Sequence, residues 1–588
     1  MSSSGTVRGL TRIWSRGECV PDVARLPGVL LEPLPARVMA ARGLLDEGAS
    51  AFLEPSLRML HDPSLLDGLD RTVERVLEAA AAGEPIAVYG DYDVDGVTAT
   101  AILVRTLRAI APGARVLTYI PHRIDEGYGL NAEAIRSLAS EGARVIVSVD
   151  CGITATGPAD VARDLGVDLI ITDHHNGAAR AEELPRAYAI VHPRKPGSTY
   201  PFGDLCGAGV AYKIAWRLCT MHAGSARLPQ ELRELLVELL ALAALGVVAD
   251  VVPLQGENRV IARHGLSRIR TSPFVGLRAL VRASGLDGER VDAEGVGFSL
   301  APRLNACGRL GHAREALELM LTEDAARATE IAQSLTKLND QRRGVERRIV
   351  EQATEMARAC GMDGPDVRAV VLAHEEWHAG VVGIVCSRLV ERFGRPTILM
   401  QRQNGLLVGS GRSIEGFSLH GALEACAEHL HGFGGHDMAA GVKVAPERLD
   451  AFVGAFVAHA NAKLRPEDLV TRVRYDCDAP MHELTLPAVR QLESLAPFGN
   501  GNPPVRVRLT GLRMSKRPEP FGKHGGHLKF EVKDRDRSLR LLAWNWGSRH
   551  AETAASIPAG ARIDALVVPK VSSWSGLVEP ELVDLQTQ

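Results

Sequence analysis

The strongest constraint on the fold is the segment at residues 86–100, IAVYGDYDVDGVTAT. A short apolar run, typical of a buried strand, ends in three alternating aspartates, Asp91, Asp93 and Asp95, with Gly96 directly behind them. Three like charges within five residues repel one another unless a positive charge lies between them. The segment therefore predicts a cation site at the end of a buried strand.

The pattern D-x-D-x-D-G also begins the calcium-binding loop of an EF-hand. In that loop the twelfth position carries a glutamate, and a helix precedes the first position. Counting from Asp91, the twelfth position is Ile102, and the residues before Asp91 have the pattern of a strand. The sequence therefore excludes an EF-hand and favours a site at the edge of a sheet.

From residue 85 onward, short β-rich runs alternate with helical ones, which predicts a parallel sheet covered by helices on both faces. Two further runs, RVIVSVD and DLIITDHH, end in Asp150 and in Asp173-His174-His175. The segment ALGVVADVVPL, interpreted as another strand end, carries Asp250. Ligand sites in such sheets form beyond the carboxyl ends of the strands, so these side chains are expected to converge.

Oxygen and imidazole ligands without sulfur suit Mn²⁺ or Mg²⁺ better than zinc. Four or more carboxylates can hold two such ions, with one shared aspartate as the bridge. Each residue alone has a simpler explanation, because an aspartate after a strand is usually a helix N-cap or a turn residue. The combination of several such residues, each at an expected strand end, favours a two-ion site.

The rest of the chain divides into four further parts. Residues 1–84 are mostly helical in pattern, and residues 466–588 carry short alternating strands with Gly turns, as in a small barrel. Residues 363–465 restart a β-α-β pattern. Residues 323–362 contain a long helical stretch of about 50 Å at 1.5 Å per residue, either one helix of a bundle or a strut between two lobes.

Composition limits the class of protein. Hydrophobic residues make up 46% of the 588 residues and charged residues 24%, as in soluble globular proteins. The sequence contains no run of 18 apolar residues, so no membrane span is expected. The first residues lack the apolar core of a secretory signal, and nine cysteines include no C-x-x-C pair, so we expect a cytoplasmic protein without structural zinc. The net charge of −3 means that polyanion binding would need a local basic lining.

Four motifs, DYDVDG, SVDCG, TDHH and VADVVPL, resemble in this order the motifs of the DHH phosphoesterases. Further similarity covers nearly the whole chain, including PHRIDEGYGL, LAPRLNACGRLGHA, GSGRSIEGFSLHGAL, HGFGGHDMAAGV and FGKHGGHLKF. The resemblance implies an α/β protein: a parallel-sheet DHH domain at 85–322 and a second α/β, DHH-associated, domain at 363–465, joined by the long helix. A C-terminal OB-fold β-barrel at 466–588 would bind nucleic acid.

The resemblance also implies roles for residues of the cation site. The metal ligands would be Asp91, Asp93, Asp95, Asp150, His174 and Asp250, holding two Mn²⁺ or Mg²⁺ ions with Asp150 as the bridge. Asp150 and His175 would be catalytic, with His175 contacting a phosphate or protonating the leaving oxygen. Several relatives carry histidine at the position of Tyr89, so water or Asp91 would replace one ligand here.

The substrate-binding residues implied by the resemblance form two sets. Arginine offers forked donors that fit a 5′-phosphate, and an isolated arginine without these motifs is normally a solvated surface charge. The first set is Arg123, Arg303, Asn305, Arg309, Ser410 and Arg412, with Gly434, Gly435 and His436 where the backbone would approach a nucleotide. The second set is Lys523 and Lys529 of the barrel, near Lys516, Phe521 and Phe530, a combination that suits phosphate contact and base stacking.

The activity implied by the resemblance is 5′→3′ exonucleolytic hydrolysis of single-stranded DNA with release of 5′-mononucleotides, in DNA recombination and repair. The partners would be single-stranded DNA, a helicase and a single-strand-binding protein, and the protein would be a monomer in the cytoplasm, at the nucleoid. Two alternatives stay open: a phosphodiesterase acting on short oligonucleotides, cyclic dinucleotides or pyrophosphate, and a non-catalytic DNA-binding scaffold. The length of the chain favours a polymer, and the complete candidate ligand set argues against a scaffold.

Overall fold

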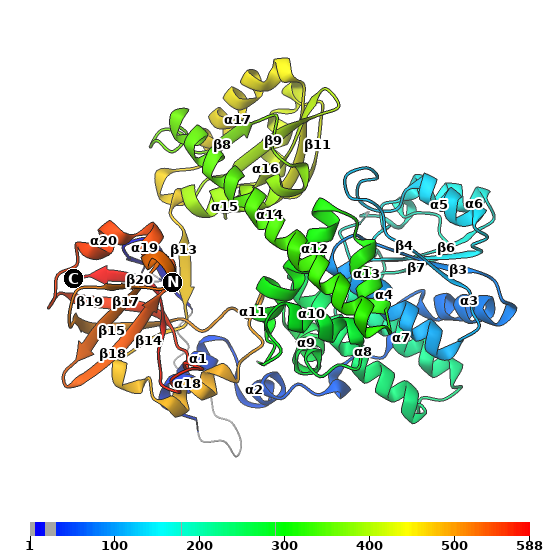
Figure 1. Cartoon of the computed structure of the whole chain (residues 1–588), viewed down its shortest axis with the longest axis horizontal. Helices are drawn as coiled ribbons and strands as arrows, with labels where there is room; N and C mark the ends of the chain where they lie inside the picture. Colours follow the sequence, from blue (N-terminus) through cyan, green and yellow to red (C-terminus); the bar gives the residue numbers. More distant parts are fainter. Residues whose placement is uncertain (1–5, 18–30, 178, 289) are drawn as a thin grey trace.

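The computed structural model describes residues 6–17, 31–177, 179–288 and 290–588 and shows three lobes (Figure 1). The first lobe contains the predicted parallel sheet and lies at the right of Figure 1. The second contains a five-stranded sheet at the top, and the third is the C-terminal barrel at the left. No helix in these described ranges is both long and apolar enough to cross a membrane.

The sheet of the first lobe is entirely parallel, as the alternating pattern predicted. Its strand order is β4 (Val116–Tyr119), β3 (Ile86–Gly90), β5 (Val145–Val149), β6 (Asp168–Thr172) and β7 (Ala189–Val191). Ile86 and Val88 of β3 pack against α3 (Leu69–Ala82), α4 (Val94–Ile110) and α7 (Gly207–His222). Ala87 and Tyr89 face α5 (Ala132–Ser140) and α6 (Thr156–Asp164), so both faces of the sheet are covered.

A helical layer completes the first lobe. It contains α8 (Gln230–Ala249), α9 (Gly256–Ile269), α10 (Val275–Ala283), a π-helical turn (Val296–Leu300), α12 (Ala301–Leu310) and α13 (Arg314–Leu321). The interpretation of Asp250 as a strand-end residue is wrong, because Asp250 caps the C-terminus of α8. The β-branched valines around it are typical of a strand, but packing of the Ala/Leu-rich run against α9, α4 and α7 keeps it helical.

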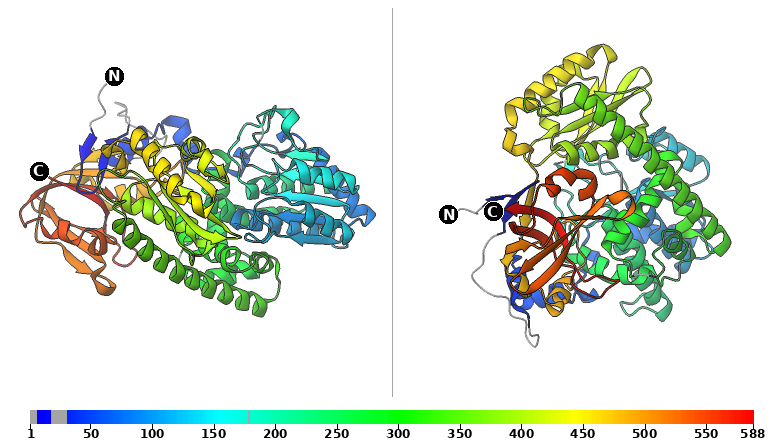
Figure 2. Two further views of the ribbon diagram at one scale, coloured as in Figure 1. Left: turned by 90° about the horizontal axis from the view of Figure 1, so that it is seen from above. Right: turned by 60° about the vertical axis from the view of Figure 1, so that its left-hand side comes forward.

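The long helix predicted for residues 323–362 is α14 (Ala325–Ala359), 35 residues that begin after the N-cap Asp324. Its first half packs against α10 and α12 of the first lobe, and its second half against α15 (Ala379–Phe393) of the second. Figure 2 shows it running along the outside of the molecule between these lobes. Of the two interpretations, the strut between lobes is the one observed.

The second lobe has a mixed sheet with the order β11, β12, β10, β9, β8. Its strands are β8 (Val370–Ala373), β9 (Thr397–Gln403), β10 (Leu406–Arg412), β11 (Gly432–Gly435) and β12 (Ala439–Val444). Helix α15 packs on β9 and β10, and α16 (Leu419–Ala425) and α17 (Leu449–Lys463) form a second apolar cluster with the sheet. The β-α-β pattern predicted here is confirmed by β8, α15 and β9.

The C-terminal lobe contains a closed five-stranded barrel, as the short alternating strands predicted. Closure follows from pairing in the circular order β15 (Val507–Met514), β19 (Arg562–Val568), β20 (Glu581–Thr587), β18 (Arg537–Ala543), β17 (His527–Asp534) and back to β15. Two short strands pair with members of this ring: β14 (Cys477–Ala479) with β15, and β16 (Glu519–Phe521) with β17. Closing the sheet removes the unpaired strand edges of the barrel.

The N-terminal residues, predicted to be mostly helical, contain α1 (Pro33–Ala41), α2 (Asp46–Leu53) and α3 but begin with two short strands that the pattern did not predict. Strands β1 (Thr6–Arg8) and β2 (Ile13–Arg16) pair with β13 (Arg472–Tyr475), which belongs to the C-terminal lobe. Buried Trp14 donates its indole N–H to Asp584 at 2.9 Å, and α1 packs against α18 (Leu486–Glu493). Strands of three and four residues are too short to give a period of two in the sequence, so this part of the prediction failed.

Candidate metal centre

The three alternating aspartates lie where β3 passes into α4. Asp91 follows the strand, and Asp93 caps the helix, its Oδ1 accepting hydrogen bonds from the amides of Asp95 at 2.9 Å and Gly96 at 3.1 Å. A Cβ on Gly96 would lie 2.5 Å from the carbonyl oxygen of Asp91, so this turn can carry only glycine. The sequence DYDVDG is therefore a tight strand-to-helix turn that presents carboxylates at the sheet edge.

Asp95 is held by the start of another helix. Its carboxylate accepts hydrogen bonds from the amides of Gly207 at 2.6 Å and Ala208 at 2.9 Å, at the N-terminus of α7. A Cβ on Gly246 of α8 would lie 2.3 Å from Asp95 Oδ1. The helix N-terminus favours the negative charge, and the small residues bring α7 and α8 close to it.

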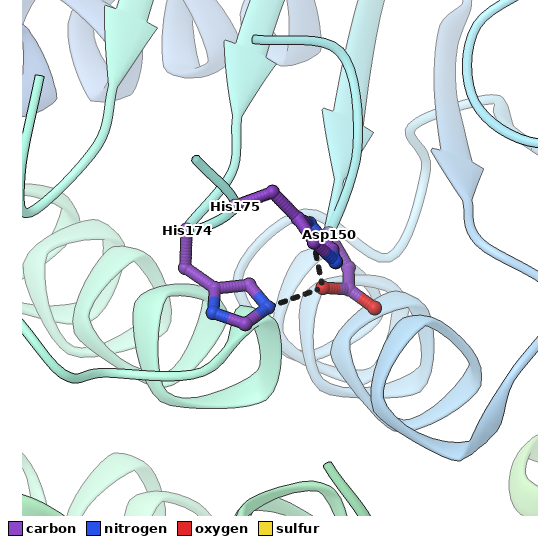
Figure 3. A group of neighbouring side chains, drawn as sticks. All are labelled: Asp150, His174 and His175. Carbon is purple, nitrogen blue, oxygen red and sulfur yellow. Dashed lines mark ion pairs between the residues drawn. The ribbon is translucent and has the colours of Figure 1, made fainter. Parts of the chain in front are cut away.

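Asp150 follows β5 in the left-handed backbone region, with φ of 64°. This conformation is uncommon for any residue except glycine, but aspartate tolerates it better than most. Its Oδ1 lies 3.1 Å from Nε2 of His174 and 3.9 Å from Nδ1 of His175 (Figure 3). The strained backbone turns this carboxylate toward the histidines that follow β6.

The structure brings all six predicted metal ligands and His175 together. Three overlapping sets of side chains have ligand atoms within 4.8 Å of one another: Asp91, Asp93 and Asp150; Asp95, His174 and Asp250; and Asp150, His174 and His175. Asp150 and His174 each belong to two sets, as expected of residues between two ions. Strand ends and a helix end far apart in sequence thus meet at one edge of the sheet.

Tyr89 lies away from this cluster. Its hydroxyl donates to the carbonyl of Gly129 at 2.9 Å, and its ring stacks on Tyr119 on the opposite face of the sheet. Asp91 lies within the cluster instead. Asp91, whose carboxylate groups with those of Asp93 and Asp150, is the residue placed to offer a ligand oxygen at this end of the site.

The residues present fit divalent cations. Asp91 Oδ1, Asp150 Oδ1 and His174 Nε2 are buried, and none of them makes a hydrogen bond within the described part of the chain. Burial and the charges of neighbouring aspartates raise the pKa of Asp91, Asp93 and Asp150, and raise that of Asp250 to about 8. Burial lowers the pKa of His174 to about 4, which leaves its imidazole neutral, the form that binds metal. Divalent cations would supply the positive charge that this cluster lacks.

Asp173 orients His175. Its carboxylate accepts hydrogen bonds from the amides of Ile153, His174 and His175 and from Nδ1 of His175 at 2.8 Å. Burial opposes the imidazolium, but the hydrogen bond and charge of Asp173 outweigh it and raise the pKa of His175 to about 9. The hydroxyl of Tyr128 lies 3.2 Å from Nε2 of the same ring. Asp173 was predicted from the TDHH motif to lie at the converging strand ends but not to orient His175.

A group of arginines lies beside the metal cluster. Burial and the charges of Arg123, Arg342 and Arg412 lower the pKa of Arg309 to about 10, so these three guanidinium groups lie near enough to act on it; of the three, Arg342 also pairs with Glu346 at 2.6 Å. Arg123 lies over the ring of Tyr92 at 4.2 Å and is near enough to Asp91 to stabilise its charge. Such a group fits a phosphate. The sequence analysis missed Arg342, because in the long helix α14 it could not be told from a surface charge.

The second lobe adds Ser410 and Arg412 on β10. Ser410 is paired with Gly441 of β12, and Gly441 with Gly434 of β11, so two glycines continue the row of Ser410 across the sheet. Within the described residues, a Cβ on Gly434 would meet nothing within 4 Å, which leaves the backbone open to a ligand. Gly435 has φ of 133°, and the amide of His436 closes the hairpin on the carbonyl of Ala439.

Arg303 and Asn305 face different surroundings. Arg303 donates to the carbonyl of Ser299 at 2.6 Å and to the hydroxyl of Thr336 at 3.2 Å, which ties the π-helical turn to α14. Asn305 lines the central cavity together with Arg309. Of the predicted substrate residues, Asn305 and Arg309 thus line the cavity, and Arg303 does not.

The barrel residues differ in part from the expectation. Phe530 is fully buried in the barrel core, so its predicted stacking on a base is wrong. Lys529 and Lys516 form ion pairs with Glu519, at 2.9 and 2.7 Å. A second aromatic group consists of Phe521 and His527, both partly buried, and Trp544, which is 45% exposed. Lys523 lies in a short turn, Lys523–Gly525, and its side chain is outside the described part of the structure.

A cavity of about 2480 Å³ lies between the lobes. All three lobes line it, the C-terminal barrel through residues 568–571 and the second lobe through α15. Many basic side chains face it, among them Arg12, Arg263, Arg290, Arg343, Arg388 and Lys570. Phe298 of the π-helical turn also lines it and is 79% exposed. The whole-chain charge of −3 concealed this basic lining.

Three stretches of the chain match known domain families. Residues 85–247 match the DHH family N-terminal domain, residues 366–461 the DHHA1 domain and residues 475–583 the RecJ OB domain. These stretches correspond to the first lobe, the second lobe and the barrel.

Whole proteins match as well. The single-stranded-DNA-specific exonuclease RecJ of Bacillus subtilis (strain 168) is 38% identical over 556 residues, which are 94% of this chain and 67% of that protein. The RecJ of Escherichia coli (strain K12) is 35% identical over 529 residues, 87% of this chain and 90% of that protein. The crystal structure of RecJ from Thermus thermophilus with Mn²⁺ matches with a TM-score of 0.80 and 33% identity over 98% of this chain and 79% of that one. The complex of the same protein with Mg²⁺ gives a TM-score of 0.75.

Proposed function

This chain belongs to the RecJ family of single-stranded-DNA-specific exonucleases, and from that membership we propose that it hydrolyses single-stranded DNA from the 5′ end, releasing 5′-mononucleotides. The observation that carries the proposal is the convergence of six candidate metal ligands beside a group of four arginines, at a cavity lined by basic side chains. The cofactor is a pair of divalent cations, Mn²⁺ or Mg²⁺.

Divalent cations, when bound, would supply charge neutralisation and an activated water for displacement at phosphorus. The residues that would hold them are Asp91, Asp93, Asp95, Asp150, His174 and Asp250, which fall into overlapping sets with ligand atoms within 4.8 Å of one another.

His175 acts on the substrate. Because Asp173 accepts the Nδ1 proton, the ring is held with Nε2 on the side away from Asp173, where it would bind the scissile phosphate or give a proton to the departing 3′-oxygen. The Tyr128 hydroxyl lies 3.0 Å from Nδ1 and 3.2 Å from Nε2 and so contacts the same ring.

The arginine group receives the 5′-terminal phosphate. Arg123 and Arg309 come from the first lobe and Arg412 from the second, so an end-bound phosphate is held at the junction of two lobes. The strand then continues through the basic cavity toward the barrel, where Phe521 and Trp544 can stack on bases. Binding of the terminal phosphate at this junction would fix the distance between the strand end and the scissile bond.

Duplex exclusion, partners and location are further parts of the proposal. An opening between the lobes that admits one strand would exclude a duplex, and a helicase and a single-strand-binding protein would then supply and hold the substrate. The protein acts as a monomer at the nucleoid, in the cytoplasm, in DNA recombination and repair.

The test is product analysis on a 5′-phosphorylated 50-mer supplied with Mn²⁺ as single-stranded DNA, duplex DNA or RNA. We expect 5′-mononucleotides from the single-stranded DNA, appearing from the 5′ end, and little cleavage of the duplex. Equal rates on duplex and single strand, or activity confined to dinucleotides, would contradict the proposal and favour a phosphodiesterase for short substrates.

Phe298 is expected to stack on a base in the cavity. Loss of one such contact costs about 1–3 kcal/mol, so Phe298→Ala should weaken single-strand binding about tenfold. The Kd is measured by fluorescence anisotropy with a chelator present, so that the strand is not cut. Leu65→Ala is the control, because Leu65 is 48% exposed but lies outside the cavity lining. Equal affinities for all three proteins would contradict this role of Phe298.

A further inference from the structure

A loop of the C-terminal lobe contacts the segment that directly follows Asp250. The loop comprises residues 495–502, LAPFGNGN, and the segment comprises residues 251–255, VVPLQ. The side-chain amide of Asn500 donates to the carbonyl of Val251 at 2.8 Å, and the backbone carbonyl of Asn500 accepts from the amide of Leu254 at 2.8 Å. The amide of Gln255 donates to the carbonyl of Gly501, also at 2.8 Å. A domain distant in sequence therefore bonds directly to the residue next to a candidate metal ligand.

The contacted residue has a strained backbone. Val251 has φ of 60°, a left-handed conformation that is a genuine outlier for a β-branched residue and costs of order 1–3 kcal/mol. Its side chain is 63% exposed, so burial of that side chain does not hold the conformation. The backbone on either side of Val251 is instead held by hydrogen bonds: the amides of Asp250 and Val251 donate to the carbonyls of Gly246 at 2.9 Å and Val248 at 3.3 Å in α8, and the Val251 carbonyl accepts from Asn500.

The loop that carries Asn500 is firmly fixed. Arg259 of α9 is almost fully buried and donates to the carbonyls of Leu495 at 3.1 Å and Ala496 at 3.0 Å. Asn502 is also buried; its amide donates to the carbonyls of Leu495 and Pro497, and its oxygen accepts from Arg42. These bonds do not involve Asn500, so the loop stays docked when the Asn500 side chain is changed.

We propose that Asn500 is a positioning residue for the metal centre. By holding the Val251 carbonyl, it keeps the strained peptide in the one orientation that points the Asp250 carboxylate at Asp95 and His174. Asp250 Oδ2 lies 3.5 Å from His174 Nε2. Without that bond, Val251 relaxes to an unstrained conformation and Asp250 swings away from the cluster. The inference rests on the proposed function only in taking the cluster to be a cation site.

The loop also connects the cavity with the metal centre. Asn500, Gly499, Val251 and Leu254 all line the large cavity. A DNA strand bound in the cavity would therefore lie against the contact that orients Asp250. The C-terminal lobe would then take part in the geometry of the metal centre as well as in strand binding.

The test measures Mn²⁺ binding to the full chain without DNA. Binding is detected by titration calorimetry and by the electron paramagnetic resonance signal of free Mn²⁺. Groups that support metal ligands through hydrogen bonds typically contribute 10- to 100-fold to affinity, so Asn500→Ala should weaken one Mn²⁺ site about tenfold. The matched control is Gln255→Ala, which removes a bond of equal length across the same junction but leaves the Val251 carbonyl bonded. We expect the control to bind Mn²⁺ as the wild type does, and thermal unfolding to be similar for all three proteins.

Equal affinities for Asn500→Ala and wild type would overturn the proposal. Equal weakening by both variants would also overturn it, because docking of the lobes in general, rather than orientation of Asp250, would then set the affinity. A wild-type chain that binds no Mn²⁺ would instead refute the cation site itself, so the two failures are distinguishable.

Discussion

Replacing Asp150 with asparagine should reduce cleavage of single-stranded DNA by about 10³-fold or more. Asp150 is shared by two of the three ligand sets, and charge stabilisation by such a site contributes several kcal/mol to the barrier, each 1.36 kcal/mol being a factor of ten in rate. Asparagine is the appropriate replacement, because it tolerates the left-handed backbone at φ of 64° as aspartate does, whereas alanine adds strain.

The measurement is single-turnover cleavage with Mn²⁺, together with the Kd for the same strand in the presence of a chelator. We expect strand affinity to change little, because Asp150 is buried and does not line the cavity. Asp164→Asn, on the exposed surface of α6, is the control. Unchanged cleavage by the Asp150 variant would refute its assignment as a metal ligand.

Replacing Glu257 with leucine should lower the stability of the first lobe by about 3–5 kcal/mol, because an uncompensated charge is left buried. Lys213 and Glu257 form an ion pair in which both side chains are almost inaccessible to solvent. The ammonium also donates to the carbonyl of His61 at 2.6 Å, and the carboxylate accepts from the Tyr200 hydroxyl at 2.5 Å. The pair joins α7 and α9 to the N-terminal segment around His61.

Urea unfolding followed by fluorescence and circular dichroism measures this effect as a fall in the midpoint of the first transition. The double variant Lys213→Met/Glu257→Leu removes both charges and should recover much of the loss. Glu318→Gln breaks an exposed pair with Arg327 and should leave the midpoint almost unchanged. A double variant less stable than Glu257→Leu alone would show that the pair is not the cause.

The first lobe was predictable from sequence because its signals are local and agree with one another. The run at residues 86–100 combines a buried strand, which was predicted, with an aspartate that caps the next helix, which was the simpler explanation weighed against a cation site. The candidate ligands converge because parallel strands end at one edge, which is a property of the topology rather than of any one residue.

The failures come from contacts distant in sequence. Val248 and Val251 flank Asp250 with β-branched residues, and only packing against neighbouring helices makes the preceding run helical. Phe530 and Trp544 are both aromatic residues in barrel segments, and the barrel closure decides that one is buried and the other exposed. Arg342 gains its place beside Arg309 only through the packing of α14 on α12.

The pairing of β2 with β13 has a consequence for biosynthesis. The two strands are joined side by side although about 460 residues separate them in the chain. At a translation rate of about 5–20 residues per second, β2 leaves the ribosome roughly 23–90 s before its partner exists. During that time the first two lobes can fold as they emerge, while the edge of β2 that pairs with β13 has no partner strand. Pairing of β2 must then follow synthesis of β13, and chaperone dependence should concentrate on β1 and β2.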